Sequence, residues 1–358
     1  MRFLQGAVLA AMSLLSVALA APSVLPVALS APALKPPRLV LYHQTTHDKK
    51  GNPISILPLI CEDGISLTHL IVASFHINEG SVLTLNDYPP TSPLFRTLWN
   101  ETKILQEAGV RVMGMIGGAA AGSFTQRTLD TRDKATWKRY YGQLRAVIKQ
   151  YGLNGLDIDV EQPMSQLGIS RLILQLRKDF GQDFEVSLAP VASALTKGAN
   201  LSGFNYTALE QQLGDSIAFY NVQFYNGFGH MYSTHKFDRI MNHGWDPKRI
   251  VIGQLTHPIH GSSYVPFKTL KSTFTALRKK YGTIGGVMGW EYFHTMPGGL
   301  RRPWRWAQAM TEILQPKKLG IRISPQRAAT LIQAWWESRQ GSTEAPVNVD
   351  YMAMVNTV

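Results

Sequence analysis

The sequence predicts an α/β fold, a single-domain (β/α)8 barrel, and three observations support this prediction. Short apolar segments alternate with longer amphipathic segments through residues 38–316. Such alternation is typical of parallel strands joined by crossover helices. Eight predicted strands in a segment of this length match the usual size of a (β/α)8 barrel. A doubly wound open sheet, the competing architecture, is disfavoured because no Gly-rich phosphate-binding fingerprint follows any predicted strand.

The predicted elements follow from the spacing of the apolar residues. Short apolar runs predict strands, and apolar residues three or four positions apart predict helices. The expected strands are residues 38–42, 69–75, 110–115, 155–161, 184–189, 217–225, 250–255 and 285–290. The expected helices are residues 92–108, 131–151, 165–180, 206–213, 233–243, 270–281 and 303–314.

The segment 155–161 alternates strictly between apolar and acidic residues, which predicts a strand with its carboxyl groups on one face. Those groups belong to Asp157, Asp159 and Glu161 and would stand roughly 6–7 Å apart. Like charges at that range, together with burial, raise the pKa of at least one carboxyl group, as a proton donor requires. A solvated acidic edge strand is the alternative. A closed barrel has no edges and desolvates these acids at high cost, which favours a functional role.

Polar and aromatic residues gather where the predicted strands end. Barrels of this kind carry their active sites at the carboxyl ends of the strands. The residues concerned are Tyr42, Gln44, Phe75, Glu161, Gln223, Tyr225, Asn226, Gln254, Trp290 and Glu291.

The two ends of the chain are expected to lie outside the barrel. Residues 1–20 carry a basic start, an apolar run and an Ala-Leu-Ala cleavage site, which predicts a secretory signal peptide. A membrane anchor is less favoured because the apolar run is shorter than the roughly 20 residues a span needs. Residues 21–37 form a Pro/Ala-rich lead-in, and residues 317–358 are expected to hold a helix and a disordered tail. The protein is thus expected outside the cell, either released or retained at the cell wall.

The net charge of +12 leaves the partner open. Nucleic acid is disfavoured by the signal peptide and by the scatter of the basic residues, whereas anionic cell-wall or glycan surfaces and simple solubility remain.

Cys61 is the only cysteine, so no intrachain disulfide forms, and it is expected to be a small buried hydrophobe. Three sequons make Asn100, Asn200 and Asn205 candidates for N-glycosylation.

Several motifs resemble those of family-18 glycoside hydrolases. Residues 154–161, Asn-Gly-Leu-Asp-Ile-Asp-Val-Glu, resemble the family's D-G-x-D-x-D-x-E motif. Residues 223–226 resemble its sixth-strand motif, and residues 285–290 resemble the eighth-strand segment whose Trp floors the sugar site. Gly117 and Gly118 resemble the end of its third-strand S-x-G-G motif. The motifs follow in the right order, and the chain is most similar to the secreted endo-β-N-acetylglucosaminidases of filamentous fungi.

This sequence departs from the family pattern at two positions. Asn154 stands where the long motif begins with an acid, and Met115 replaces the Ser of S-x-G-G. We expect the first change to tune the site, and the second removes a hydroxyl that usually lies near the inner carboxylates. Neither change touches the expected proton donor.

The resemblance implies a retaining hydrolase in which the acetamido group of the substrate is the nucleophile, an exception to the usual two-carboxylate scheme. Glu161 would protonate the glycosidic oxygen and then activate water. Asp159 would hold the acetamido N–H, and Asp157 would lie deeper and share a proton with Asp159. Tyr225 would bind the acetamido carbonyl oxygen, and Trp290 would form the floor of the −1 subsite. Further lining residues would be Gln223, Asn226, Tyr42 and Phe75.

The resemblance implies neither a cofactor nor a metal, and the histidines show no metal-ligand spacing. The expected partners are N-glycans of glycoproteins or chitin oligosaccharides, with no nucleic acid and no membrane anchor. The protein itself is expected to be a monomer. Residues 256–284 leave no room for the insertion domain of deep-clefted chitinases, which predicts a shallow cleft. Three functions follow: an endo-β-N-acetylglucosaminidase, a chitinase, and an inactive glycan-binding protein. The presence of Glu161 disfavours the last.

Overall fold

The computed structural model describes residues 35–315 and Thr330. The predicted signal peptide and nearly all of the predicted lead-in lie outside the described residues. So do the C-terminal helix and tail, apart from Thr330. No helix of the described part is long and apolar enough to cross a membrane.

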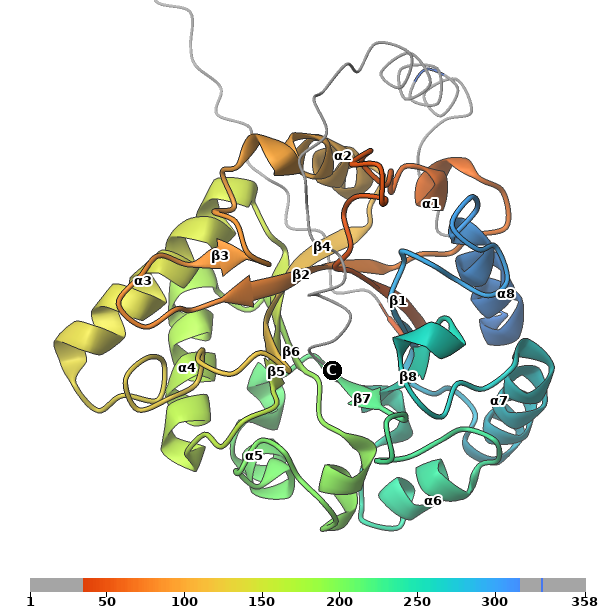
Figure 1. Ribbon diagram of the computed structural model, residues 1–358. Coiled ribbons are helices and arrows are strands. Elements are labelled where there is room, and N and C mark those ends of the chain that lie inside the picture. Colours follow the sequence, from red (N-terminus) through yellow and green to blue (C-terminus); the bar gives the residue numbers. More distant parts are fainter. Residues whose placement is uncertain (1–34, 316–329, 331–358) are drawn as a thin grey trace, which may run out of the picture. The chain divides into compact units, whose positions relative to one another are not determined.

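Within residues 35–315, parallel strands close into a barrel, which confirms the predicted (β/α)8 architecture (Figure 1). The hydrogen-bonded order is β1-β9-β8-β7-β6-β5-β4-β2, and pairing of β1 with β2 closes the ring. These strands are β1 (Arg38–His43), β2 (His69–His76), β4 (Arg111–Gly118), β5 (Gly155–Val160), β6 (Glu185–Leu188), β7 (Phe219–Gln223), β8 (Ile250–Leu255) and β9 (Gly286–Trp290). The short β3 (Thr84–Leu85) pairs antiparallel with the end of β2 and is not part of the barrel.

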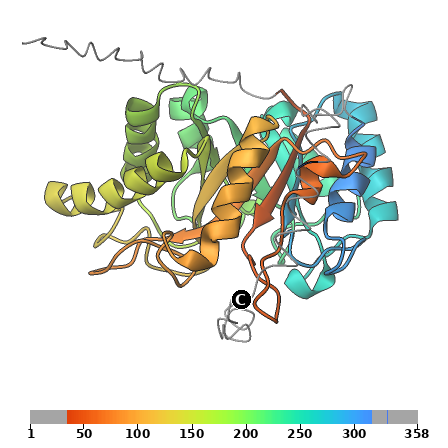
Figure 2. The ribbon, with the colours of Figure 1, turned by 90° about the horizontal axis from the view of Figure 1, so that it is seen from above.

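Helices surround the barrel, as Figures 1 and 2 show. They are α1 (Pro58–Cys61), α2 (Arg96–Glu107), α3 (Lys134–Tyr151), α4 (Gln166–Phe180), α5 (Tyr206–Leu213), α6 (His235–Met241), α7 (Phe267–Tyr281) and α8 (Trp304–Leu314). Single 3₁₀ turns are η1 (Pro93–Phe95), η2 (Ala192–Thr196), η3 (Gly214–Ser216), η4 (Pro247–Arg249) and η5 (Pro258–His260).

Side-chain caps fix where several helices begin. The Asp133 carboxylate accepts a hydrogen bond from the Thr136 N–H, so α3 begins at residue 134, three residues later than predicted. Ser165 caps α4 in the same way, and the predicted start of that helix is correct to one residue. The capping side chain satisfies an N–H that the first turn leaves unpaired, and it therefore sets the boundary.

The main core lies between the barrel and the helices. Leu156, Ile158 and Val160 of β5 point into it and are at most 2% exposed. The acidic residues of the same strand therefore point into the barrel, as the alternation predicts. Cys61, expected to be buried, is half-buried, and burial raises the pKa of its thiol to about 11. The asparagines of all three sequons are exposed, and their glycosylation stays a prediction.

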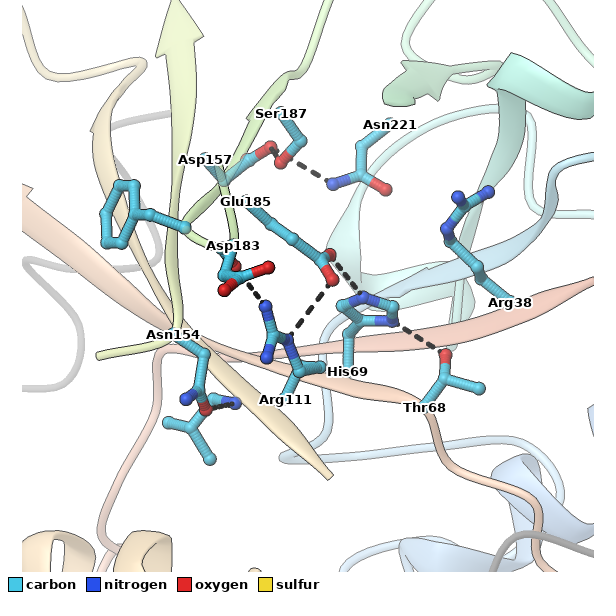
Figure 3. A network of polar contacts seen from close by, with 12 residues as sticks. Arg38, Thr68, His69, Arg111, Asn154, Asp157, Asp183, Glu185, Ser187 and Asn221 are labelled. Carbon is cyan, nitrogen blue, oxygen red and sulfur yellow. Dashed lines mark hydrogen bonds and ion pairs between the residues drawn. The ribbon is translucent and has the colours of Figure 1, made fainter. Parts of the chain in front are cut away.

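A buried ionic network fills the amino-terminal end of the barrel (Figure 3). His69 Nε2 lies 2.8 Å from Glu185 Oε2, and Arg111 Nε lies 3.2 Å from Glu185 Oε1. The Arg38 guanidinium stacks 4.7 Å from the centre of the Phe219 ring. Burial alone would raise the pKa of Glu185, but attraction to His69 and Arg111 outweighs it and lowers that pKa. This carboxylate therefore compensates the buried guanidinium groups of Arg38 and Arg111, whereas burial lowers the pKa of His69.

We expect Glu185→Gln to lower the free energy of unfolding at pH 7 by about 3–5 kcal/mol, because it leaves buried cations without a counter-charge. A carboxyl group with a lowered folded-state pKa stabilises the fold above its unfolded pKa, and that contribution disappears as the pH falls through the folded value. The difference between wild type and variant should thus shrink below about pH 4. Urea denaturation across this range measures it. Glu312→Gln is the matched control, since Glu312 is 57% exposed in its pair with Lys271; a loss as small as in that control would contradict the role of Glu185.

Candidate active site

The three acids of the β5 segment occupy a gradient of burial inside the barrel. Asp157 is fully buried, Asp159 is 6% exposed, and Glu161, which directly follows β5, is half-buried. Parallel strands place their carboxyl ends at one end of the barrel, so Glu161 is the acid at the open end. The structure thus brings together the three acids that the sequence singled out and orders them by depth.

Asp157 is held by three donors from three other strands. Tyr42 Oη donates to Asp157 Oδ2 at 2.6 Å. Ser187 Oγ and Asn221 Nδ2 donate to Oδ1 at 2.5 and 3.1 Å (Figure 3). Burial raises the pKa of Asp157, and these hydrogen bonds offset part of that rise. Asp157 is thereby fixed in position at the base of the site.

Asp159 carries the strongest electrostatic perturbation of the three acids. Burial, followed by the nearby carboxyl groups of Glu161 and Asp157, raises its pKa well above the ordinary value. A hydrogen bond joins its carboxyl group to that of Glu161. Two adjacent buried carboxylates would repel each other, so this arrangement favours one proton shared between Asp159 and Glu161.

The side-chain amide of Gln223 connects the upper two acids. Its Nε2 lies 3.1 Å from Asp159 Oδ1 and 3.1 Å from Glu161 Oε1. The same nitrogen lies 3.0 Å from the Ala189 carbonyl oxygen on β6. A neutral amide that donates to both acids stabilises their negative charge without adding a competing cation.

Aromatic side chains form an apolar wall beside the acids. The Trp290 ring lies 5.4 Å from the Tyr42 ring, centre to centre, at a tilt of 58°. Tyr225 is 6% exposed and belongs to the same cluster inside the barrel. Burial, then the negative charges of Asp159, Glu161 and Asp157, raises the pKa of Tyr225. Tyr225 thus stays protonated and keeps a hydroxyl that can donate.

A comparison with family models places these features in a known group. Residues 38–257 match the model of glycosyl hydrolases family 18, and this match includes the three acids and Gln223. The chain belongs to glycosyl hydrolase family 18.

Two proteins of solved structure and one curated protein are relatives of this chain. A fungal endo-β-N-acetylglucosaminidase of the family is 58% identical, with a TM-score of 0.77, over 79% of this chain and 99% of that one. The chitinase ChiC from Aspergillus fumigatus is 45% identical, with a TM-score of 0.70, over 77% and 98%. Chitinase 2 of Rhizopus oligosporus is 26% identical over 283 residues, and the match covers 70% of this chain and 48% of that protein. The chain thus spans about half the length of this last relative.

The two departures from the family-18 motifs have clear structural settings. Met115 lies inside the barrel, directly beside Asp157 in the pairing of β4 with β5, and offers it no donor. Ser187, which pairs with Asp157 from β6 on the other side, supplies a hydroxyl instead. The side-chain oxygen of Asn154 accepts from Val112 N at 2.9 Å and from Gln106 Nε2 at 3.0 Å. Asn154 therefore secures the start of β5 and does not join the three acids.

Phe75 lies outside the site, although strict alternation along β2 would point it into the barrel with Ile71 and Ala73. The pairing register of β2 shifts between Val72 and Phe75, and this irregularity turns the Phe75 side chain outward. Its ring stacks on Trp99 of α2 at 6.4 Å and is fully buried. Phe75 thus packs the outer core and does not line the mouth of the barrel.

Side-chain bonds to the backbone connect the loops around the site. Asn226 Oδ1 accepts from Ser262 N at 2.9 Å, so it joins the loops after β7 and β8. Glu291 follows Trp290 and is buried, and its carboxylate accepts from Gln44 N at 2.9 Å, Thr45 N at 2.8 Å and Thr45 Oγ1 at 2.7 Å. Burial raises the pKa of Glu291, and these three donors offset part of the rise. The loop after β1 is thereby fixed beside the Trp290 ring.

In the part of the chain that the structure describes, no group of three His, Cys, Asp or Glu residues is placed to hold a metal ion. The donors around the acids are amide, hydroxyl and phenol groups. The arrangement can hold and transfer protons, and it can stabilise positive charge beside Asp159.

We expect Asp159→Asn to raise the free energy of unfolding at pH 7, because the carboxyl group that it replaces is buried beside two other acids. A carboxyl group with a raised folded-state pKa favours the fold below its unfolded pKa, and that contribution is lost as the pH rises through the folded value. The amide takes no charge, so the gain over wild type should grow from about pH 4 upward.

Chemical denaturation between pH 3.5 and pH 8 tests this expectation, with exposed Asp63→Asn as the control. A variant that is less stable than wild type at neutral pH would show that Asp159 is not held at an electrostatic cost.

Proposed function

We propose that this protein is a secreted endo-β-N-acetylglucosaminidase that cleaves the GlcNAc-β-1,4-GlcNAc core of N-glycans. The observation that carries the proposal is the 58% identity to a fungal endo-β-N-acetylglucosaminidase over 99% of that chain. The buried, proton-sharing acids support a working hydrolase and disfavour an inactive glycan-binding protein. Secretion rests on the N-terminal sequence pattern.

In the proposed reaction the acetamido oxygen of the −1 sugar attacks the anomeric carbon. Glu161, at the open end of the row, gives its proton to the glycosidic oxygen as the bond to the leaving sugar breaks. Glu161 then takes a proton from the water that opens the oxazolinium intermediate, so the configuration is retained. Gln223 holds this carboxyl group in place between the two steps.

Asp159 and Tyr225 would orient the acetamido group. Asp159 binds its N–H and stabilises the positive charge of the intermediate, and the neutral Tyr225 hydroxyl donates to its carbonyl oxygen. Tyr42, Ser187 and Asn221 fix Asp157. Asp157 in turn holds the Asp159 side chain in position beneath the sugar. The Trp290 ring provides the apolar floor.

The open end of the barrel suits a branched substrate. Between β8 and β9 the structure contains only η5, α7 and their connections, with no inserted domain in this stretch. Without an inserted domain beside it, the mouth of the barrel would leave space for the antennae of an N-glycan. Chitinase is the second candidate, favoured by the 45% identity to ChiC.

We expect Glu161→Gln to reduce kcat by at least about 100-fold, in the range typical for loss of a general acid–base group. The amide has nearly the same shape, so the variant should unfold at the wild-type temperature. Turnover of a chromogenic GlcNAc glycoside or a glycoprotein, with Glu312→Gln as the control, measures the effect. Retention of more than a tenth of the wild-type kcat would contradict the proposed role of Glu161.

The choice between the two substrates is tested by incubating the protein with a high-mannose glycoprotein and with chitin oligosaccharides. We expect release of the glycan with a single GlcNAc left on the protein, detected as a mass loss by mass spectrometry, and slow cleavage of the oligosaccharides. Rapid cleavage of the oligosaccharides with an untouched glycoprotein would instead establish the chitinase.

A further inference from the structure

A separate cavity of about 130 Å³ opens between η2 and α6. Its walls include Ala192, Ser193 and Thr196 of η2, Phe228 of the loop after β7, and Lys236 and Arg239 of α6. None of these residues contributes to the row of acids or to its donors.

The chain connects two walls of the cavity to the candidate active site. Ala192 directly follows Val191, which bridges in parallel to Gln223, the residue that connects Asp159 and Glu161. Phe228 lies two residues after Asn226, and its N–H bonds to the Tyr225 carbonyl oxygen at 3.1 Å. Both walls come from loops that leave the carboxyl ends of β6 and β7. The cavity therefore lies on the side of the barrel that carries the acids.

The cavity is positively charged. Lys236 and Arg239 are three residues apart on α6 and so lie on the same side of the helix. Within residues 35–315 no ion pair joins either cation to an acid. Asp238, which lies between them in sequence, instead bonds Thr234, Tyr281 and Lys280. Two charges at the cavity thus have no protein counter-ion in the described part.

The neutral walls restrict what the cavity can hold. Ser193 Oγ donates to the Ala199 carbonyl oxygen at 2.7 Å, and Thr196 Oγ1 donates to the Ser193 carbonyl oxygen at 3.0 Å. The hydroxyl protons are therefore already used, and the remaining side-chain donors at the cavity are the two cations. The volume is also below the roughly 150 Å³ of a cavity that accepts benzene. A compact oxyanion fits this volume, and the two cations are the side chains that can bind it.

We propose that this cavity binds a phosphate ester group carried by the glycan substrate, and the proposal rests on the proposed action on glycans. Arg and Lys are the side chains that recognise phosphate oxygens through charge-assisted hydrogen bonds. The phosphate would bind between Lys236 and Arg239 while the neighbouring sugars reach the acids past Phe228. The site would then favour phosphorylated glycans over neutral ones.

The test compares a glycoprotein that carries phosphorylated high-mannose glycans with the same glycoprotein after phosphatase treatment. For the wild type we expect a KM about tenfold lower for the phosphorylated form, with similar kcat. Lys236→Gln/Arg239→Gln should abolish this preference and leave the KM for the neutral form unchanged. Lys149→Gln/Lys178→Gln makes the same charge change at the C-terminal ends of α3 and α4, at the opposite end of the barrel, and should keep the preference.

A binding experiment separates this site from the proposed function. Mannose 6-phosphate, mannose and inorganic phosphate are titrated into the Glu161→Gln variant by NMR, with and without the Lys236/Arg239 substitutions. We expect mannose 6-phosphate to bind, mannose not to bind, and the double substitution to remove binding, whether or not any glycoprotein is cut. Equal KM values for the two glycoprotein forms, or the same mannose 6-phosphate binding after the double substitution, would overturn the proposal. Failure to cut either glycoprotein would instead overturn the proposed function.

Discussion

The site depends on the burial of three carboxyl groups inside the barrel, because each group must be neutralised or hydrogen-bonded to remain there. Asp157 is satisfied by donors from β1, β6 and β7, and Asp159 by Gln223 and by the proton that it shares with Glu161. The polar residues of the neighbouring strands follow from this requirement. Tyr42, Ser187 and Asn221 occupy the inward positions from which a donor reaches Asp157.

The ionic network at the other end of the barrel has a different electrostatic character. Around Glu185, cations outnumber the acid and lower its pKa, whereas around Asp159, acids outnumber cations and raise the pKa of that group. The first arrangement stabilises a charge, and the second keeps a proton available. Val40, Ile71 and Met113 belong to an apolar cluster inside the same barrel and limit the access of water between the two ends. One barrel thus maintains two opposite charge states by the composition of its inward positions.

The sequence predicted the strands well because each barrel strand is a short apolar run, and it predicted the order of the acids because alternation is a local property. It could not predict Ser187 or Asn221 as donors to Asp157, since that requires the register between strands that are distant in sequence. A polar residue at an inward position of a buried strand was the available signal. Phe75 was misplaced because a register shift after Val72 breaks the alternation on which the prediction depended. The four-residue α1 and two-residue β3 are too short for any periodicity to be read.

In the proposed reaction the acids and Gln223 act only on the linkage that is cut, so the choice of substrate would come from residues outside this row. The loops beyond the strand ends can contact the rest of a substrate. In this protein hydrogen bonds connect these loops to each other. Glu291 fixes the loop after β1, Asn226 joins the loops after β7 and β8, and Tyr232 Oη bonds the Tyr264 carbonyl oxygen at 2.7 Å. Bonds of this kind hold the mouth of the barrel in one shape before a substrate arrives, which lowers the ordering cost of binding. A mouth of fixed shape admits a substrate according to the size and charge of that substrate. The proposed phosphate site in the positive cavity beside β6 and β7 would add a choice by charge to the choice by size.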